Sequence, residues 1–298
     1  MTYKPPAERP SSEQRKPDNA QALCRAVDNN EPSLPRYARL PINRCNLPSV
    51  ILGGLTFQHH PAPLYLDGVA ELHADLFRRL AVIDDKSLRA EAFRDYLTVR
   101  FRLEKLEEAG LSERSRNRAK ANWMRVIRGW SFDSDGREGA VLKGWVESRF
   151  GLLPRFHGQA LRDFTGHAYL RYQEMRSAGL YGTNALEAQL DLLYSYTQYE
   201  FRRSETESRW VELFRGVNRL DEHEVLEKDG RRQVVLFNNL VSFTSSRERA
   251  GEFGDYIVST RVPLEKIFFC HTSIPGVLKA EEEYLVIGGI YDIRLQTV

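Results

Sequence analysis

The sequence predicts an α+β fold in which a helical region precedes a β-rich core. Before Trp210, apolar residues of the 298-residue chain recur every three or four positions, as they do on one face of a helix. From Trp210 onward, short runs of β-branched and aromatic residues are separated by glycine and polar turns, which is typical of strands. Helices and strands that are segregated along the chain indicate the α+β class.

Residues 1–35 are expected to form a disordered tail. They contain six of the thirteen prolines and little apolar surface to offset the entropy of ordering the chain. The formal net charge of +2 provides no chain-wide basic field for nucleic acid or a membrane surface. Cys24, Cys45 and Cys270 are too widely spaced for a disulfide framework, and no signal sequence is evident. We therefore expect a cytoplasmic protein without membrane insertion.

Residues 36–206 are expected to be mainly helical, possibly for recognition of a target. The first apolar face combines Val69, Leu72, Leu76 and Leu80. A second face over residues 93–101 predicts a helix that ends at Ala109-Gly110, because glycine readily adopts the left-handed cap conformation. A later helix is expected to begin after Thr183, which can serve as its N-cap.

Residues 207–298 are expected to form the β-rich core. Strands are predicted over residues 211–217, 224–227, 233–237, 240–244, 256–262, 267–270, 284–287 and 291–295. Asp229-Gly230 lies between the second and third of these and predicts a hairpin turn. One short helix is expected between residues 246 and 253.

Two motifs in this core carry candidate binding residues. Arg215-Gly216 lies within an apolar strand, where a buried guanidinium needs an anionic partner and glycine allows a ligand to approach the backbone. Ser242 and Thr244 share one face of a strand, where hydroxyls can orient a carboxylate or a sugar. The alternative interpretation of Arg215 is a structural ion pair. The alternative interpretation of Ser242 and Thr244 is a hydrogen bond between hydroxyl side chains of neighbouring strands.

A third motif, Glu281-Glu282-Glu283, precedes an apolar strand. Period-two geometry places Glu281 and Glu283 on one side and Glu282 on the other. Paired carboxylates suit reactions in which positive charge develops on a sugar ring. The alternative interpretation is a solvated acidic turn.

The order of these motifs over residues 209–298 resembles the Arg–Ser–Glu class of ADP-ribosyltransferases, and Ala250-Gly251-Glu252-Phe253 resembles the short helix of that class. Segments 40–48, 53–58 and 238–245 resemble, more narrowly, the dinitrogenase reductase ADP-ribosyltransferases. The resemblance implies a core of two packed sheets, NAD as co-substrate without a metal, and an arginine of the nitrogenase iron protein as acceptor. It also implies a PII-type signalling protein as regulator.

The resemblance further implies a role for each motif residue. Arg215 would hold the pyrophosphate of NAD, and the backbone of Gly216 would approach the nicotinamide amide. Ser242 would support the nicotinamide ribose and the catalytic glutamate. Glu283 would bind the ribose 2′-hydroxyl and stabilise the cation, while Glu281 would orient and help deprotonate the acceptor guanidinium.

Two registers stay open at this point. The serine motif can start at Ser242 or at Thr244; the apolar pair before Ser242 favours the first, with Thr244 as a further NAD-binding residue. The apolar run after Glu283 favours its pairing with Glu281, whereas a slip by one residue would promote Glu282.

Other features compete for a functional interpretation. The acid-free basic run between Arg114 and Arg128, with interleaved tryptophans, fits a solvated helix face, a docking face for an acidic target or a nucleic-acid patch. His59-His60 lacks zinc-ligand spacing, and residues 133–136 lack the spacing of a calcium loop, so a turn is expected there. The alternatives in function are a transferase for a different protein and a non-enzymatic module that binds NAD or nucleic acid.

Overall fold

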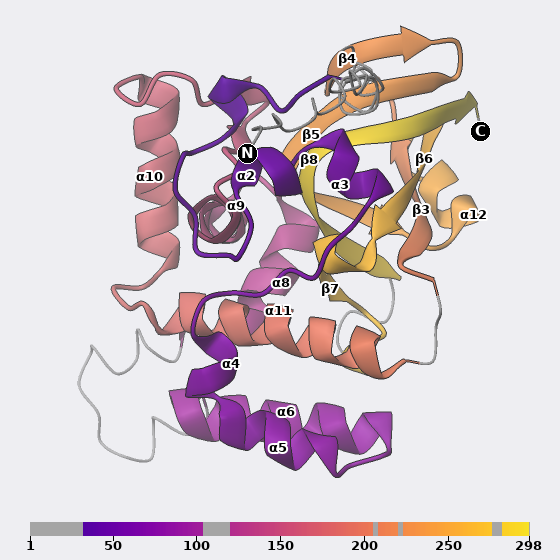
Figure 1. Cartoon of the computed structure of the whole chain (residues 1–298). Helices are drawn as coiled ribbons and strands as arrows, with labels where there is room; N and C mark the ends of the chain where they lie inside the picture. The colour runs from indigo at the N-terminus through magenta and orange to yellow at the C-terminus, as the bar shows by residue number, and fades with distance from the viewer. Residues whose placement is uncertain (1–31, 104–119, 205–207, 220–222, 276–281, 298) are drawn as a thin grey trace, which may run out of the picture. The chain divides into compact units, whose positions relative to one another are not determined.

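In the computed structural model, most helices lie to one side of a β-sheet, to its left and below it in Figure 1. The structure describes residues 32–103, 120–204, 208–219, 223–275 and 282–297. All of these residues belong to one compact unit, Pro32–Val298. The predicted tail, residues 1–35, lies almost wholly outside the described residues. Among the described helices, none is both long and apolar enough to cross a bilayer.

The expected helical region before the strands is confirmed. The helical elements are η1 (Arg36–Ala38), α2 (Ser49–Leu52), α3 (Leu55–His59), α4 (Val69–Leu72), α5 (Ala74–Ala81), α6 (Lys86–Phe101), α8 (Trp123–Phe132), α9 (Arg137–Phe150), α10 (His167–Gly179), α11 (Ala185–Arg203), α12 (Arg247–Gly251) and η3 (Leu264–Lys266). The hydroxyl of Thr183 accepts a hydrogen bond from the Ala185 amide at 3.1 Å. It therefore helps to satisfy the start of α11, although Asn184 occupies the cap position itself.

Two helix boundaries differ from the prediction. The expected helix over residues 69–80 is broken at His73, whose Nδ1 lies 2.9 Å from the hydroxyl of Tyr96. The expected apolar face is therefore not continuous: Leu76 is buried, whereas Leu72 is 66% exposed. Helix α6 ends at Phe101, because Arg102 already takes the left-handed conformation with φ of 53°. Ala109-Gly110, where the end was expected, lies outside the described residues.

The α+β class is confirmed by the strands, which form a six-stranded and a two-stranded sheet within the described residues. The strands are β1 (Arg155–Phe156), β2 (Gln159–Ala160), β3 (Trp210–Val217), β4 (Glu224–Asp229), β5 (Arg232–Thr244), β6 (Tyr256–Pro263), β7 (Ile267–Cys270) and β8 (Glu283–Thr297). The predicted hairpin is present, with Gly230 at φ of 56°. Residues 284–287 and 291–295 belong to one continuous strand, because pairing with β5 continues at Gly289 after a register shift.

The six-stranded sheet curls around an inner core. Its pairings run in a circuit from β5 to β3, β6, β8 and back to β5, all antiparallel. The inner core combines Leu213, Val217, Val235, Phe237, Val241, Phe243, Val258, Val262, Ile267, Cys270, Val286, Tyr291 and Ile293. Because successive side chains of a strand point to opposite faces, Val234, Leu236 and Leu240 of β5 lie on the outer face of the sheet, away from the inner core.

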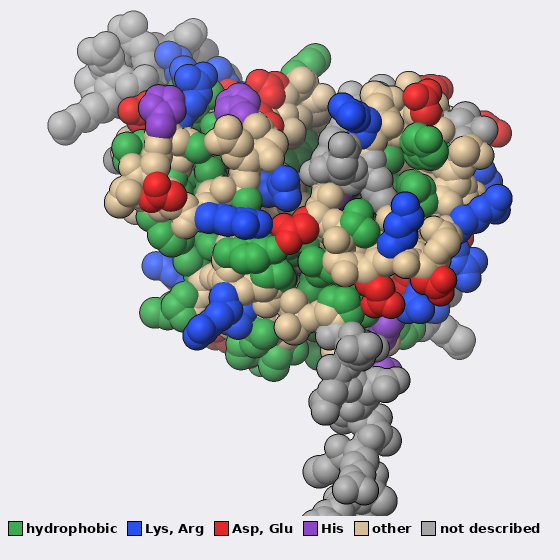
Figure 2. All heavy atoms as spheres, turned by 90° about the horizontal axis from the view of Figure 1, so that it is seen from above, with side chains coloured by type: hydrophobic (Ala, Val, Ile, Leu, Met, Phe, Trp, Pro, Cys, Tyr) green, Lys and Arg blue, Asp and Glu red, His purple; other side chains and the backbone are tan. Residues whose placement is uncertain are grey.

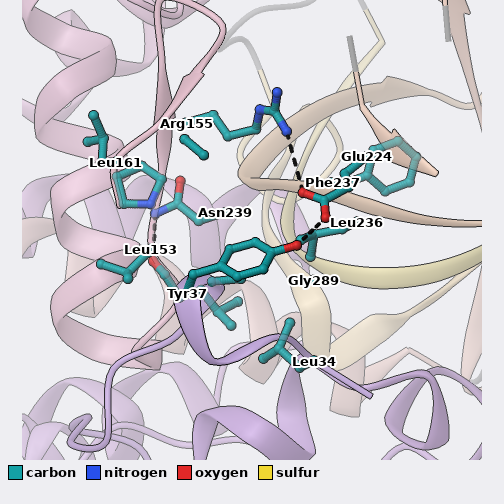
Figure 3. Close-up of a pocket in the computed structure, with 14 residues that line it drawn as sticks. Leu34, Tyr37, Leu153, Arg155, Leu161, Glu224, Leu236, Phe237, Asn239 and Gly289 are labelled. Carbon is teal, nitrogen blue, oxygen red and sulfur yellow. Dashed lines mark hydrogen bonds and ion pairs between the residues drawn. The ribbon is translucent and has the colours of Figure 1, made fainter. Parts of the chain in front are cut away.

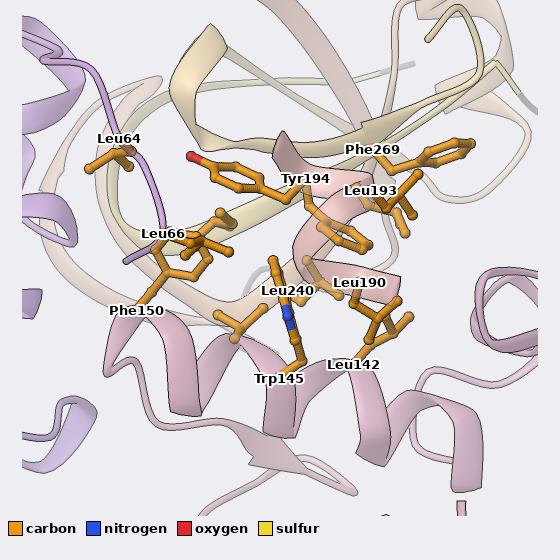
Figure 4. Packing of buried hydrophobic residues seen from close by; sticks show 14 of the residues in the cluster. Leu64, Leu66, Leu142, Trp145, Phe150, Leu190, Leu193, Tyr194, Leu240 and Phe269 are labelled. Atoms are coloured by element: carbon orange, nitrogen blue, oxygen red, sulfur yellow. The ribbon is translucent and has the colours of Figure 1, made fainter. Parts of the chain in front are cut away.

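That outer face of the sheet packs against the helices and forms the helix-side core. Figure 4 shows Leu142 and Trp145 of α9 together with Leu190 of α11, Leu240 of β5 and Phe269 of β7. The ring of Trp145 also lies 4.7 Å from that of Phe268, measured between centroids. Burial of this apolar surface fixes α9 against β5 and α8 against α9, and this packing decides which side chains of α8 reach the candidate site.

A buried polar contact fastens the N-terminal segment to the sheet. The Gln58 side chain on α3 donates to the carbonyl oxygens of Arg261 and Asp292 at 3.0 and 3.2 Å, and it accepts from the Asp292 amide at 2.7 Å. Gln58 is only 6% exposed, so losing these partners would leave buried polar atoms unsatisfied. Segment 53–58, noted in the sequence, therefore has a structural function.

Candidate active site

A cleft of about 710 Å³ lies between the strands and the helices. Its strand wall includes Phe214, Arg215, Gly216, Val217, His223, Asn238, Ser242, Thr244 and Glu283. Its helix wall includes Trp130, Ser131, Phe132, Asp135 and Lys143. The volume falls within the range of about 300–1,000 Å³ that is typical of small-molecule sites.

Hydrogen bonds join the three sequence motifs within the strand wall. The hydroxyl of Ser242 donates to Oε1 of Glu283 at 2.7 Å, and Nη1 of Arg215 donates to the backbone oxygen of Ser242 at 2.9 Å. The strand register explains this proximity, since Thr244 pairs with Phe214 on one side and with Glu283 on the other. Positions 215, 242 and 283 therefore meet in one cavity.

The two candidate serine registers differ in their geometry. The side chain of Ser242 contacts the carboxylate of Glu283, whereas Ser245 is exposed at the end of β5. Thr244 is 8% exposed and lines the cleft, and its hydroxyl accepts from the amide of Ser246 at 3.2 Å. This arrangement favours the register that starts at Ser242.

The glutamates occupy different environments. Glu283 is the first residue of β8 and is 5% exposed, so its carboxylate is held inside the cleft. Glu282 has φ of 46° and lies outside the strand, so the period-two argument does not extend back beyond Glu283. Glu281 lies outside the described residues.

Gly216 is required by packing between β3 and α12. A Cβ atom added at this glycine would lie 2.0 Å from the backbone oxygen of Ala250 on α12. Gly216 also lines the cleft, so its lack of a side chain leaves room there. On the side of α12, the chain itself makes the close approach that glycine permits.

The helix wall contacts the strand motifs directly. The indole Nε1 of Trp130 donates to the Ser242 hydroxyl at 2.7 Å, and the Ser131 hydroxyl donates to Oε2 of Glu283 at 2.8 Å. Trp130 is 4% exposed, and Ser131 follows it on the last turn of α8. Sequence analysis did not identify either residue as part of the site.

Comparison with known proteins agrees with this geometry. The family model described as dinitrogenase reductase ADP-ribosyltransferase matches residues 42–295. This chain belongs to that family. It is 40% identical over 258 residues to the "NAD(+)--dinitrogen-reductase ADP-D-ribosyltransferase" of Rhodospirillum rubrum, which covers 85% of this chain and 93% of the relative. No solved structure matches the chain.

Membership confirms the resemblance and identifies the chain as an ADP-ribosyltransferase that uses NAD. The cleft is suited to a dinucleotide with a negatively charged diphosphate, because Arg215, Arg155 and Lys143 line it beside Glu283 and Asp135. Preorganised charges of this kind can stabilise a transition state in which charge develops.

Two further ionisable residues of this transferase are buried in the cleft walls. Lys143 on α9 is 1% exposed and forms an ion pair with Asp135, while desolvation lowers the pKa of its ammonium. Burial, followed by the nearby cations Arg215 and Arg155, lowers the pKa of His223 to about 3, so its imidazole is neutral near pH 7. No local pattern in the sequence marks either residue.

The basic run is only partly described. Arg114, Arg116 and Arg118 lie outside the described residues, whereas Arg125 and Arg128 are exposed on α8. Trp123 and Trp130 are 1% and 4% exposed, so the interleaved rings belong to the core and offer no surface for base stacking. Figure 2 shows basic and acidic side chains interspersed on one face of the molecule.

A smaller cavity is lined by residues 34–38 and 152–161 and by β4, β5 and β8. Figure 3 shows Tyr37 and Arg155 directed toward Glu224 from opposite sides, with Tyr37 donating to that carboxylate. The cavity volume of about 20 Å³ suffices only for a water molecule, so this pocket is structural.

At the turn over residues 133–136, Asp133 accepts from the Asp135 amide at 2.9 Å. The described residues contain no cluster of three potential metal ligands.

Proposed function

We propose that this ADP-ribosyltransferase moves ADP-ribose from NAD to an arginine of the nitrogenase iron protein in the cytoplasm. The observation that supports the proposal is the convergence of Arg215, Ser242 and Glu283 in one cleft. The relative from Rhodospirillum rubrum, whose name gives dinitrogen reductase as its acceptor, supports the choice of target.

Binding of NAD involves the strand wall. The guanidinium of Arg215 pairs with the diphosphate by charge-assisted hydrogen bonds, and its bond to the Ser242 backbone fixes its orientation. The nicotinamide end lies near Gly216, Ser242 and Thr244. Because these residues are held by strand pairing, little conformational entropy is lost when the substrate binds.

The chemistry uses the electrostatic field of Glu283. The bond between ribose C1 and the nicotinamide nitrogen breaks, and both electrons leave with nicotinamide. Glu283 stabilises the resulting cation and binds the ribose 2′-hydroxyl. A guanidinium nitrogen of the acceptor then bonds to C1, and Glu281 accepts the proton that it loses. The reaction needs no metal.

The decisive experiment incubates the full chain with adenylate-labelled NAD and purified nitrogenase iron protein. We expect label on a single arginine-containing peptide, identified by mass spectrometry, and equimolar release of nicotinamide. Nicotinamide release without labelled protein would contradict the transferase proposal for this acceptor. Label on an added unrelated protein, with the iron protein unlabelled, would assign a different target.

Regulation by a PII-type signalling protein is proposed from the family resemblance. Its test adds such a protein to the labelling reaction and compares initial rates at a fixed NAD concentration. A change in rate that depends on the PII concentration supports it, and an unchanged rate opposes it. Charge reversal at Arg116 and Arg118 separately tests the docking interpretation, which predicts slower labelling of protein with unchanged NAD cleavage.

A further inference from the structure

The last turn of α8 holds the carboxylate of Glu283 from the side opposite the strands. Each carboxylate oxygen accepts one hydroxyl hydrogen bond, Oε1 from Ser242 at 2.7 Å and Oε2 from Ser131 at 2.8 Å. The Ser242 hydroxyl accepts in turn from the indole of Trp130 at 2.7 Å. The donors Ser242 and Ser131, one from a strand and one from a helix, therefore contact the two oxygens of the carboxylate and help to fix its plane.

The end of α8 that supplies these donors is itself fixed by packing. Val126, Ile127 and Trp130 are buried in the helix-side core. At the start of α8, the amide of Trp123 donates to the side chain of Gln189 on α11 at 3.0 Å. A helix held along its length in this way places Ser131 at a defined position.

The turn after α8 is also fastened. Asp135 forms an ion pair with Lys143, whose ammonium lies 5.9 Å from the centre of the Trp130 ring. The Lys143 side chain is only 2% exposed, so this pair is shielded from solvent. Lys143 lies on α9, which packs on β5. If the turn moved away from the strand wall, Asp135 would separate from Lys143 and leave the buried ammonium without this partner.

We propose that Ser131 and Trp130 are positioning residues for the transfer reaction: Ser131 fixes Oε2 of Glu283, and Trp130 fixes the Ser242 hydroxyl. This inference rests on the proposed function of Glu283. A carboxylate at the end of a glutamate side chain has rotational freedom, and its electrostatic effect depends on a fixed orientation toward the developing cation.

The first test measures nicotinamide release by Ser131→Ala and Trp130→Phe, each with NAD affinity and thermal stability. We expect kcat to fall about tenfold in Ser131→Ala, as for a lost hydrogen bond to a charged group, with KM for NAD changed less than about twofold. Ser131→Thr keeps the hydroxyl and should recover most of the activity. Ser177→Ala, an exposed serine of α10, and Trp210→Phe, whose indole bonds Gln58 away from the cleft, are the matched controls.

The second test combines Ser131→Ala with Glu283→Gln. If Ser131 acts through Glu283, adding Ser131→Ala to Glu283→Gln should change the residual rate by less than about twofold, because coupled residues are not additive. The same tenfold loss in both backgrounds would overturn the proposal, since it would indicate a general structural defect. An effect of Ser131→Ala on KM alone, or none at all, would also overturn it.

These outcomes are distinguishable from failure of the proposed function. All variants are compared by nicotinamide release, which requires no protein acceptor. If the wild-type chain cleaves NAD but does not label the iron protein, the proposed target fails while the ratios among variants still test the positioning residues. If Trp130→Phe unfolds, Ser131→Ala and Ser131→Thr, which leave the core intact, decide the result.

Discussion

The two walls of the cleft are encoded in different ways. In the strand wall, Arg215, Ser242 and Glu283 lie within recognisable motifs, and strand pairing brings those motifs together. In the helix wall, Trp130 and Ser131 contact the same Ser242 and Glu283 across 112 and 152 positions in sequence. Their positions depend on how α8 packs against α9 and how α9 packs against β5.

This difference separates chemical identity from orientation. The strand wall contains the residues that bond to or stabilise the substrate in the proposed reaction. The helix wall contains donors and an ion pair that hold those residues in place, and it closes one side of the cavity. Changes at Arg215 and Glu283 in the strand wall should therefore weaken binding or chemistry, while changes in the helix wall should reduce rate or stability more moderately.

The largest effect is expected for Glu283→Gln. The amide keeps the size of the side chain but removes the negative charge that stabilises the cation, so transfer should fall by about two to three powers of ten. Initial rates of label incorporation measure this, and NAD affinity should change little. Glu212→Gln, an exposed glutamate of β3, is the matched control. Undiminished transfer by Glu283→Gln would remove this residue from the mechanism.

A smaller effect is expected for Arg215→Lys. Lysine keeps the charge but lacks the planar pair of donors, so KM for NAD should rise about tenfold. The corresponding change Arg261→Lys, at an exposed position of β6 beside Trp210, should leave KM unchanged. Equal KM values for Arg215→Lys and the wild type would show that the diphosphate is bound elsewhere.

In the helix wall, Asp135→Asn should reduce stability. It leaves the Lys143 ammonium buried without a counter-charge, which should lower the free energy of unfolding by about 2 kcal/mol in urea denaturation. Adding Lys143→Met replaces the ion pair by an apolar side chain and should restore most of that loss. If the double variant is stable but binds NAD poorly, Lys143 contacts the substrate and belongs functionally with the strand wall.

The smallest effect concerns pH and His223. Burial, followed by Arg215 and Arg155, lowers the pKa of this histidine to about 3, whereas its ordinary value is 6.5. Between these values the unfolded chain binds more protons, so stability should rise with pH across this window and fall on acidification below 6.5. The slope from this residue is at most about 1.4 kcal/mol per pH unit.

His223→Gln should remove that contribution, so its stability should fall less than that of the wild type between pH 6.5 and pH 5. Urea unfolding at several pH values measures the difference. His59→Gln, an exposed histidine of α3, should retain the wild-type dependence. Identical slopes for His223→Gln and the wild type would show that the histidine titrates normally in the folded chain.

The success of the sequence predictions depended on how local the information was. The hairpin at Asp229-Gly230 was predicted correctly because a two-residue turn signal lies between alternating runs. The helix over residues 69–80 was predicted as continuous because apolar spacing does not reveal the break at His73, which bonds Tyr96 on another helix. The strands predicted over residues 284–287 and 291–295 form one, because the chain passes close to the backbone of Asn238 at Gly288 without leaving the strand.

Sequence alone determined the α+β class, the three motifs of the strand wall and the family, because these depend on residue type and short spacing. Only the tertiary structure decided that Ser131 and Trp130 hold the Glu283 site, that Lys143 and His223 are buried beside it, and that Ala250 fills the space at Gly216. The physical reason is that side-chain orientation across a cleft follows from the packing of distant elements, to which no local pattern corresponds.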